Sequence, residues 1–283
     1  MGLESYYKDH WVEIEEDRLD RYEQMFQWGP AFERYLAPAE IKPSQVVGDL
    51  GCGPGFLSRK LLRKFSPNGC VHSFNVNKDF SEHTHVKAKG LGDRLKLHYL
   101  TSETLPISDA SLDRIIAKNV MVYADDPAHT FRKFRRVSKP SGKAHAIDSD
   151  FAMLAIDPVP PSDWRALLNA AAHAFRTPNI GRKLYGLAKA AGFSSVDAQI
   201  MSTTDTKGRL LNFTKKYRRV CTGSQHVRRT IDEQHLGYRR SGVGRRPIPS
   251  SVSAICSHHC RIGRTCFSGF RCHTYRAHQS SDH

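Results

Sequence analysis

The chain has 283 residues, of which 39% are hydrophobic, so it can bury one sizeable core with an appendage. Its net charge of +15 lies mainly in residues 215–283, which hold 14 basic and 3 acidic residues, whereas residues 1–214 carry only +4 and give little reason to expect a nucleic-acid surface. No run of about 18 apolar residues occurs and the start lacks a secretory pattern, so we expect a cytoplasmic protein without a membrane span.

The first predicted element is helical. In residues 5–37 large apolar residues recur at spacings of three and four, and the pattern is interrupted at Gly29-Pro30. Charged residues between them are expected to face water or a ligand.

From residue 46 the chain alternates between short strands and helices. The apolar pattern predicts strands at 46–50, 70–74, 95–100, 112–117, 143–147 and 195–201, and helices at 56–65, 78–90, 128–137, 162–175 and 181–191. Such alternation indicates βαβ units and a parallel sheet. We therefore predict a Rossmann-like, doubly wound α/β fold with a mainly parallel sheet, in which residues 151–180 lie where a cap over the site can be inserted.

A glycine-rich turn follows the first predicted strand, which ends with Asp49 and Leu50. The turn reads G-C-G-P-G at residues 51–55. Gly51 permits a tight turn, Gly53 lets the backbone approach a ligand, and Gly55 lets helix and strand pack closely. Because the N-terminus of the next helix favours negative charge, the pattern predicts a ligand site at the carboxyl edge of the sheet.

Two alternatives compete with this interpretation of the turn. A nicotinamide or flavin dinucleotide site is the nearest rival, but its fingerprint needs Gly or Ala where this chain has Phe56. A glycine-rich turn without a ligand is the other, and the complete D-L-G-C-G-P-G string is rarer than a lone G-x-G-x-x-G. We rank both below the proposed site.

Three separated strings resemble class I S-adenosylmethionine-dependent methyltransferases, in the broad branch that includes ubiquinone and menaquinone methyltransferases. They are V-V-G-D-L-G-C-G-P-G at 46–55, L-P-I-S-D-A-S-L-D at 105–113 and R-V-S-K-P-S-G at 136–142. G-R-K-L at 181–184 and A-G-F at 191–193 resemble the end of that fold. The resemblance covers about residues 5–214, and it implies a helical lid at 1–40 and a methyltransferase domain at 41–214.

The resemblance also implies how S-adenosylmethionine is held. Asp49 would order the turn and contact the ligand's ammonium, and Asn119 would line its methionine end. Asn75 stands where an acidic residue normally holds both ribose hydroxyls. The hydrogen bonds from the ribose hydroxyls would then lack the added strength of a charged acceptor. Thr101 stands where an adenine-contacting Asp is common. The implied cofactor-binding residues are Asp49, Gly51, Cys52, Gly53, Gly55, Asn75, Val76, Thr101, Ser102, Glu103 and Asn119.

The expected reaction is methyl transfer to oxygen, carbon or nitrogen of a small, hydrophobic metabolite. It needs an acceptor in line with the sulfonium carbon and exclusion of water, whereas a general base is optional. His10, on the predicted N-terminal helix, is the candidate base. Asp148 and Asp150 follow the fifth predicted strand and are candidates to meet the substrate instead.

The tail at residues 215–283 has a different composition. Only 11 of its 69 residues are Leu, Ile, Val or Phe, a share below the roughly 20% that a core requires. We expect an irregular, disordered or aberrant tail, without the helix and final antiparallel strand usual in the family. Its Cys and His residues lack paired C-x-x-C spacing, so no metal site is predicted.

Two other functions stay open from the sequence. One is an RNA methyltransferase that uses the basic tail as a nucleic-acid arm, although the tail would bind nucleic acid without sequence preference. The other is a cofactor-binding protein that has lost catalysis.

Overall fold

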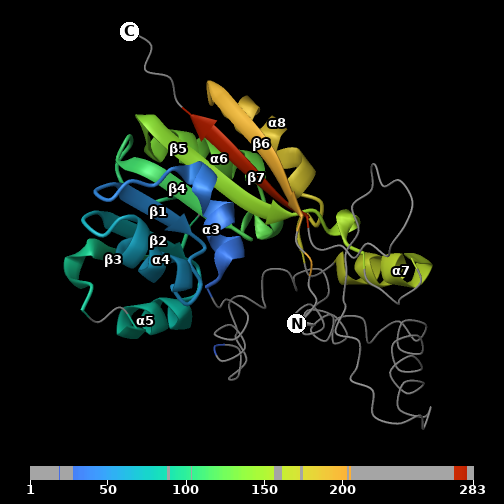
Figure 1. Ribbon diagram of the computed structural model, residues 1–283, viewed down its shortest axis with the longest axis horizontal. Helices are drawn as coiled ribbons and strands as arrows, with labels where there is room; N and C mark the ends of the chain where they lie inside the picture. Colours follow the sequence, from blue (N-terminus) through green and yellow to red (C-terminus); the bar gives the residue numbers. More distant parts are fainter. Residues whose placement is uncertain are drawn as a thin grey trace.

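The computed structural model describes residues 28–87, 90–102, 104–155, 161–172, 175–202 and 271–278, together with Leu19 and Thr204. In this part of the chain seven strands form one sheet in the order β3-β2-β1-β4-β5-β7-β6 (Figure 1). The pairs β1–β2, β2–β3, β1–β4 and β4–β5 are parallel, whereas β7 is antiparallel to both β5 and β6. The predicted doubly wound, mainly parallel sheet is confirmed.

The first six strands in chain order lie close to their predicted positions, whereas the seventh was not predicted. Their bounds are β1 Val46–Leu50, β2 Cys70–Asn75, β3 Leu95–Tyr99, β4 Leu112–Lys118, β5 Ser138–Ser149, β6 Ser195–Ser202 and β7 Arg271–His278. β5 begins earlier than predicted, because Ser138 already pairs with Leu112 before the register shifts at Arg114.

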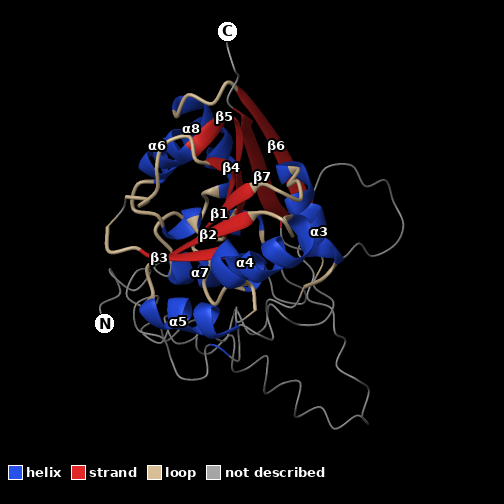
Figure 2. Ribbon diagram, turned by 90° about the vertical axis from the view of Figure 1, so that its left-hand side faces the viewer, coloured by secondary structure: helices blue, strands red, loops and turns tan. Residues whose placement is uncertain are grey.

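The helices also lie near their predicted positions, and the ends of some differ by a few residues. They are α3 Pro30–Leu36, α4 Phe56–Lys60 with the π-helical turn η2 Leu61–Phe65, α5 Lys78–Lys87, α6 Pro127–Val137, α7 Pro161–Ala171 and α8 Leu184–Ala190. Single 3₁₀ turns are η1 Ala37–Ala39, η3 Gly92–Arg94, η4 Met121–Tyr123, η5 Phe151–Met153 and η7 Gly181–Lys183. Figure 2 shows α6 and α8 on one face of the sheet and α3 on the other.

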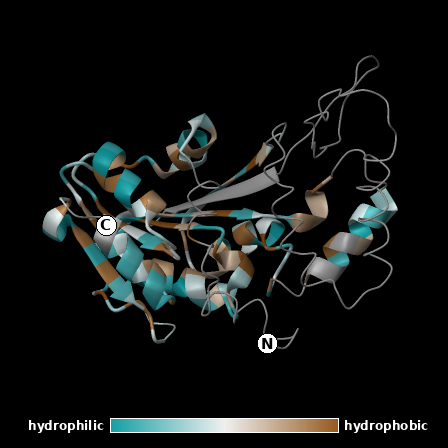
Figure 3. Cartoon of the chain, turned by 90° about the horizontal axis from the view of Figure 1, so that it is seen from below, coloured by the Kyte–Doolittle hydropathy of each residue, from teal (hydrophilic) through white to brown (hydrophobic). Residues whose placement is uncertain are grey.

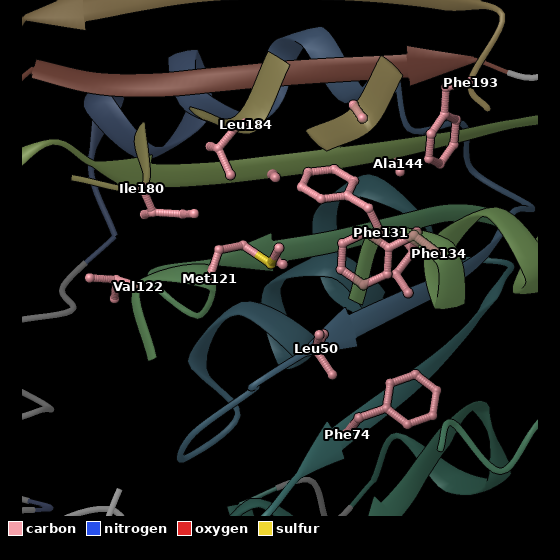
Figure 4. Close-up of a cluster of buried hydrophobic side chains, with 14 of the residues drawn as sticks. Leu50, Phe74, Met121, Val122, Phe131, Phe134, Ala144, Ile180, Leu184 and Phe193 are labelled. Atoms are coloured by element: carbon pink, nitrogen blue, oxygen red, sulfur yellow. The ribbon is translucent and has the colours of Figure 1, made fainter. Parts of the chain in front are cut away.

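Two apolar clusters lie on the two faces of the sheet. Ile115 belongs to the cluster that includes Phe131, Phe134 and Leu184 (Figure 4), and its neighbour Ile116 to the cluster that includes Leu36, Leu61 and Leu62. Successive residues of a strand point to opposite faces, so one buried strand supplies both cores. Figure 3 shows hydrophobic residues along the strands and hydrophilic ones on the outer helices.

Part of the tail belongs to the sheet. Residues Arg271–His278 form β7, which pairs along β5 from Lys143 to Ser149 and along β6 from Ser195 to Ser202. The prediction of an irregular tail without a final antiparallel strand is wrong for these eight residues. A strand placed between two others is held by backbone hydrogen bonds on both edges, and the apolar share averaged over 69 residues does not reveal it.

Other predictions fall partly or wholly outside the described residues. Of the predicted helical segment 5–37 the structure describes α3 and Leu19, so the lid at 1–40 and His10 stay predictions. α7 lies beyond the carboxyl ends of the strands (Figure 1), where residues 151–180 were expected to form a cap. In the described part of the chain no helix is long and apolar enough to cross a membrane.

Candidate cofactor and active site

Gly51 begins the turn after β1 in a backbone conformation that requires glycine. Its φ is 66°, and its N–H donates to the carbonyl oxygen of Phe74 at 2.8 Å. A Cβ on Gly51 would lie 2.4 Å from Cγ2 of Val120, which follows β4. The turn and the loop after β4 are therefore in direct contact, and only glycine lets them approach this closely.

The other two glycines of the turn differ in their surroundings. A Cβ on Gly55 (φ 75°) would lie 2.3 Å from Cγ2 of Thr84 on α5, so Gly55 is needed for packing. A Cβ on Gly53 (φ 51°) would meet no atom within 4 Å. The space over Gly53 is open at the carboxyl edge of the sheet, as expected where the backbone approaches a ligand.

Asp49 is a buried carboxyl beneath the turn, with an exposed fraction of 1%. Ser58 Oγ donates to its Oδ2 at 2.6 Å, and Ser73 Oγ donates to Ser58 Oγ at 2.7 Å. Burial raises the pKa of Asp49 to about 7, although the Ser58 hydrogen bond and the charge of Lys118 oppose the rise. Asp49 forms no ion pair with any residue that the structure describes.

The side chain of Asn75 forms hydrogen bonds to the backbone of the glycine turn and of the two residues that follow Asn75. Its Nδ2 donates to the carbonyl oxygen of Gly53 at 3.3 Å, and its Oδ1 accepts from the backbone N–H groups of Val76 at 2.9 Å and Asn77 at 3.4 Å. An amide oxygen accepts two hydrogen bonds, so the N–H that is left on Nδ2 would have to serve a ribose hydroxyl. Val76, the next residue, is 51% exposed.

The segment after β3 lies beside Asn75. The N–H of Leu100 donates to the carbonyl oxygen of Asn75 at 2.7 Å, which places Thr101 and Ser102 next to the end of β2. Both are exposed, and Ser102 Oγ accepts from the N–H of Thr104 at 3.3 Å. Glu103 lies outside the described residues.

Asn119 lies at the same edge, directly after β4. It adopts the left-handed conformation with φ 56°, and its N–H donates to the carbonyl oxygen of Ile147 at 2.8 Å. The next residue is Val120, which packs on Gly51. Asn119 is thus brought to the glycine turn, where its predicted role places it.

Asp148 and Asp150, the candidates for substrate contact, are buried and engaged within the fold. Asp148 accepts from the N–H groups of Val122 at 3.1 Å and Ser149 at 2.9 Å, and burial raises its pKa to about 7. Asp150 forms a bidentate ion pair with Arg182 and accepts from the N–H of Ala152 at 3.2 Å. Both carboxyls therefore organise the chain around the edge of the sheet.

Aromatic side chains gather where the chain enters and leaves residues 151–180. Phe151 and Phe175 stack with ring centroids 4.2 Å apart, and Tyr123 lies 5.5 Å from Phe175. Trp164 on α7 donates from Nε1 to the carbonyl oxygen of Leu154 at 2.8 Å. Phe151, Phe175 and Trp164 are buried, so an apolar cluster lies beside the carboxyl ends of β4 and β5.

Thr84, Ser58 and Ser73 support the site and were missed by the sequence prediction. Thr84 Oγ1 donates to the carbonyl oxygen of Phe80 at 2.7 Å, and the carbonyl oxygen of Gly53, at 3.2 Å, can share the same hydrogen. Ser73 lies on the buried face of β2, and Ser58 on the inner side of α4. A polar residue at a position that the apolar pattern assigns to the interior is the signal that could have found the two serines.

Comparison with known proteins finds a family model that matches part of the chain. Residues 47–142 match the family model of the methyltransferase domain. This segment is a methyltransferase domain. Together with the sheet order, the match confirms the resemblance to class I S-adenosylmethionine-dependent methyltransferases, and S-adenosylmethionine is the cofactor of that family.

Proteins similar to this segment include an uncharacterised protein and a C-methyltransferase from two bacteria. An uncharacterised 37.1 kDa protein of transposon TN4556 from Streptomyces fradiae is 30% identical over 160 residues, covering 56% of this chain and 46% of that protein. A ubiquinone/menaquinone biosynthesis C-methyltransferase from Bordetella avium is 26% identical over 129 residues, covering 46% and 50%. The chain therefore spans half or less of these relatives.

The fold is shared with solved structures. Phosphoethanolamine N-methyltransferase 2 of Haemonchus contortus, in complex with S-adenosyl-L-methionine, superposes with a TM-score of 0.57 at 13% identity and covers 99% of this chain and 60% of that one. At this identity the likeness shows the fold alone.

Proposed function

We propose that the chain transfers a methyl group from S-adenosylmethionine to oxygen, carbon or nitrogen of a small, hydrophobic metabolite. The observation that carries this proposal is the open space over Gly53 beside the buried carboxyl of Asp49, at the carboxyl edge of a parallel sheet. In open α/β sheets this edge is where ligands bind.

The residues present fit the amino-acid end of this cofactor. The ligand's ammonium needs an anionic acceptor, and Asp49 is a buried carboxyl without an ion-pair partner among the described residues. A cation bound there would favour the carboxylate form, because an opposite charge offsets the cost of burial. Asn119, held beside Val120 and Gly51, completes this end of the proposed site.

The ribose and adenine end would extend towards β2 and β3. Asn75 would offer its second Nδ2 hydrogen to a ribose hydroxyl, while Val76, Thr101 and Ser102 are exposed beside it. Cys52 is buried within the turn, and its N–H donates to the carbonyl oxygen of Phe74 at 3.1 Å, so we assign it to shaping the turn.

S-adenosylmethionine would supply an electrophilic methyl group on its sulfonium. The contribution of the chain is to orient the acceptor towards that methyl group and to exclude water. Phe151, Phe175 and Tyr123 make the chain beside the carboxyl ends of β4 and β5 apolar, and this supports an apolar acceptor. His10 stays our proposed general base for acceptors that must lose a proton.

The acceptor atom is left open in this proposal. The relative from Bordetella avium is called a C-methyltransferase, and the Haemonchus contortus protein that shares the fold is called an N-methyltransferase, so the names do not agree on one acceptor atom. The same experiment also tests the two alternatives, an RNA methyltransferase and a cofactor-binding protein that has lost catalysis.

The test is incubation of the full chain with methyl-labelled S-adenosylmethionine and extracts of its own cells. Small-molecule and RNA fractions are then separated, and the labelled products are identified by mass spectrometry. We expect label in a small molecule with the unaltered chain and none with Gly53→Val. Label at a defined RNA base would favour the RNA alternative, and binding without label in any fraction would favour the inactive protein.

A further inference from the structure

One peptide group, that of Val122, joins three segments at the edge of the sheet. Its N–H donates to Oδ2 of Asp148 at 3.1 Å. Its carbonyl oxygen accepts from the backbone N–H groups of Arg176 and Thr177, each at 3.0 Å. The end of β5, the loop after β4 and the return of the chain from α7 therefore meet at Val122.

On one side this junction reaches the glycine turn. Val122 follows Asn119 and Val120 by at most three residues, and Val120 packs directly on Gly51. The loop is held at its start by the hydrogen bond from Asn119 N–H to the carbonyl oxygen of Ile147, and further along by Asp148. If a ligand in the turn displaced Val120, the position of Val122 would therefore change as well.

On the other side the junction reaches the acceptor side of the proposed site. Phe151 N–H donates to the carbonyl oxygen of Pro178 at 3.0 Å, and the Phe151 ring stacks on Phe175. Met121, Val122 and Ile180 belong to one buried cluster, which Figure 4 shows. Residues 175–178 are thus fixed to the loop after β4 by backbone hydrogen bonds and apolar packing.

Asp148 is the carboxyl of this network. Its carboxyl is 1% exposed, and its two oxygens accept backbone N–H groups from Val122 and Ser149. Among the described residues it has no ion-pair partner, so these hydrogen bonds are its main compensation for burial. These two hydrogen bonds hold the N–H groups of Val122 and Ser149 at the end of β5.

We propose that Asp148 is a positioning residue that couples occupancy of the glycine turn to the order of residues 175–178 through the peptide group of Val122. The proposal rests on the proposed function, because the ligand of the turn is taken to be S-adenosylmethionine or its product. By reciprocity, the same coupling would let an acceptor bound against residues 175–178 strengthen cofactor binding. The coupling element is a continuous set of buried hydrogen bonds and packed side chains.

The test measures amide hydrogen exchange of the peptides that contain Arg176 and Thr177, with and without saturating S-adenosylhomocysteine. Calorimetry establishes binding of S-adenosylhomocysteine independently. In the unaltered chain we expect the ligand to slow exchange at these amides by about fivefold or more. The amide oxygen of Asp148→Asn can accept only one of the two N–H groups in the same geometry. In this variant a saturating amount of ligand should no longer slow exchange at Arg176 and Thr177, so the gain in protection should be lost.

Asp150→Asn is the matched control. Asp150 is also a buried carboxyl at the end of β5, and its hydrogen bonds are to Ala152 and Arg182. Among the described residues, the N–H of Val122 donates to Asp148 and not to Asp150. The gain should persist in this variant. A residue that serves only stability would change exchange equally with and without ligand.

Two results would overturn the proposal. One is binding of S-adenosylhomocysteine to the unaltered chain with no change in exchange at Arg176 and Thr177, which decides the matter even if Asp148→Asn fails to fold. The other is an undiminished gain in folded Asp148→Asn. If calorimetry detects no binding to the unaltered chain, the proposed function fails first and this proposal fails with it.

Discussion

The side-chain amide of Asn75 donates a hydrogen bond to the carbonyl oxygen of Gly53, 3.3 Å away, and so links the end of β2 to the glycine turn. Asn75→Asp would replace this donor with a carboxylate oxygen that faces another acceptor. We expect the free protein to lose about 1 kcal/mol of unfolding free energy.

The same variant should bind S-adenosylmethionine more tightly by about 1 kcal/mol, because a ribose hydroxyl would donate to a charged acceptor. Chemical denaturation and calorimetry measure the two effects separately. Weaker binding by folded Asn75→Asp would mean that the ribose is held elsewhere.

Gly53→Val should abolish binding of S-adenosylmethionine, because the side chain would fill the open space over the turn. Gly92→Val is the matched control. Gly92 also has a left-handed φ, of 60°, and no atom within 4 Å of its Cβ position, but it precedes β3 at the opposite edge of the sheet. Both variants carry the same kind of backbone strain, and only the first should lose binding in calorimetry. Unchanged affinity in folded Gly53→Val would contradict the site.

Affinity for S-adenosylhomocysteine should depend on the ionisation of Asp49. Burial raises the pKa of this carboxyl to about 7 in the free protein, whereas the ligand's ammonium favours the carboxylate. Affinity should therefore fall about tenfold as the pH is lowered from 8 to 6, since the proton must then be displaced. Titration calorimetry across this range measures the effect. In Asp49→Asn binding should be weaker throughout, and this part of the pH dependence should be absent.

The free energy of unfolding of the free protein should also depend on pH through these buried carboxyls. The pKa values of Asp49 and Asp148 are raised from 3.8 to about 7, so the folded state binds more protons than the unfolded state between those values. The contribution of each carboxyl to unfolding free energy is therefore full below pH 4 and declines as the pH rises through 7. The difference between the unaltered chain and Asp148→Asn, measured by denaturation at several pH values, isolates one of them. A difference that does not vary with pH would show that Asp148 is not protonated in the folded state.

Removal of the tail should damage the fold. A chain ending at Thr214 lacks β7, so β5 and β6 would each lose the partner that joins them. We expect loss of the cooperative thermal transition and of S-adenosylmethionine binding. A chain ending at His278 keeps β7 and should behave like the full chain. If the chain ending at Thr214 melts and binds normally, the tail is dispensable and β7 is not part of the functional fold.

The amino-acid sequence by itself determined the alternation of strands and helices and the position of the glycine turn after the first strand. These features are local, because a strand or helix that buries one face must repeat apolar residues at its own period. The turn is local as well, since a strand that leads directly into a helix needs residues tolerant of positive φ at Gly51, Gly53 and Gly55.

Only the tertiary structure decided which distant residues complete the site. Thr84 against Gly55, Val120 against Gly51 and Asp148 beneath Val122 are contacts set by strand order and by the packing of α5 and the loop after β4. The local pattern singled out Asp148 for a different role and did not single out Thr84 or Val120, because these contacts arise only when separate elements meet. β7 shows the same limit, since its eight residues become a strand through hydrogen bonds to β5 and β6 on both edges, and those partners lie more than 65 residues earlier in the chain.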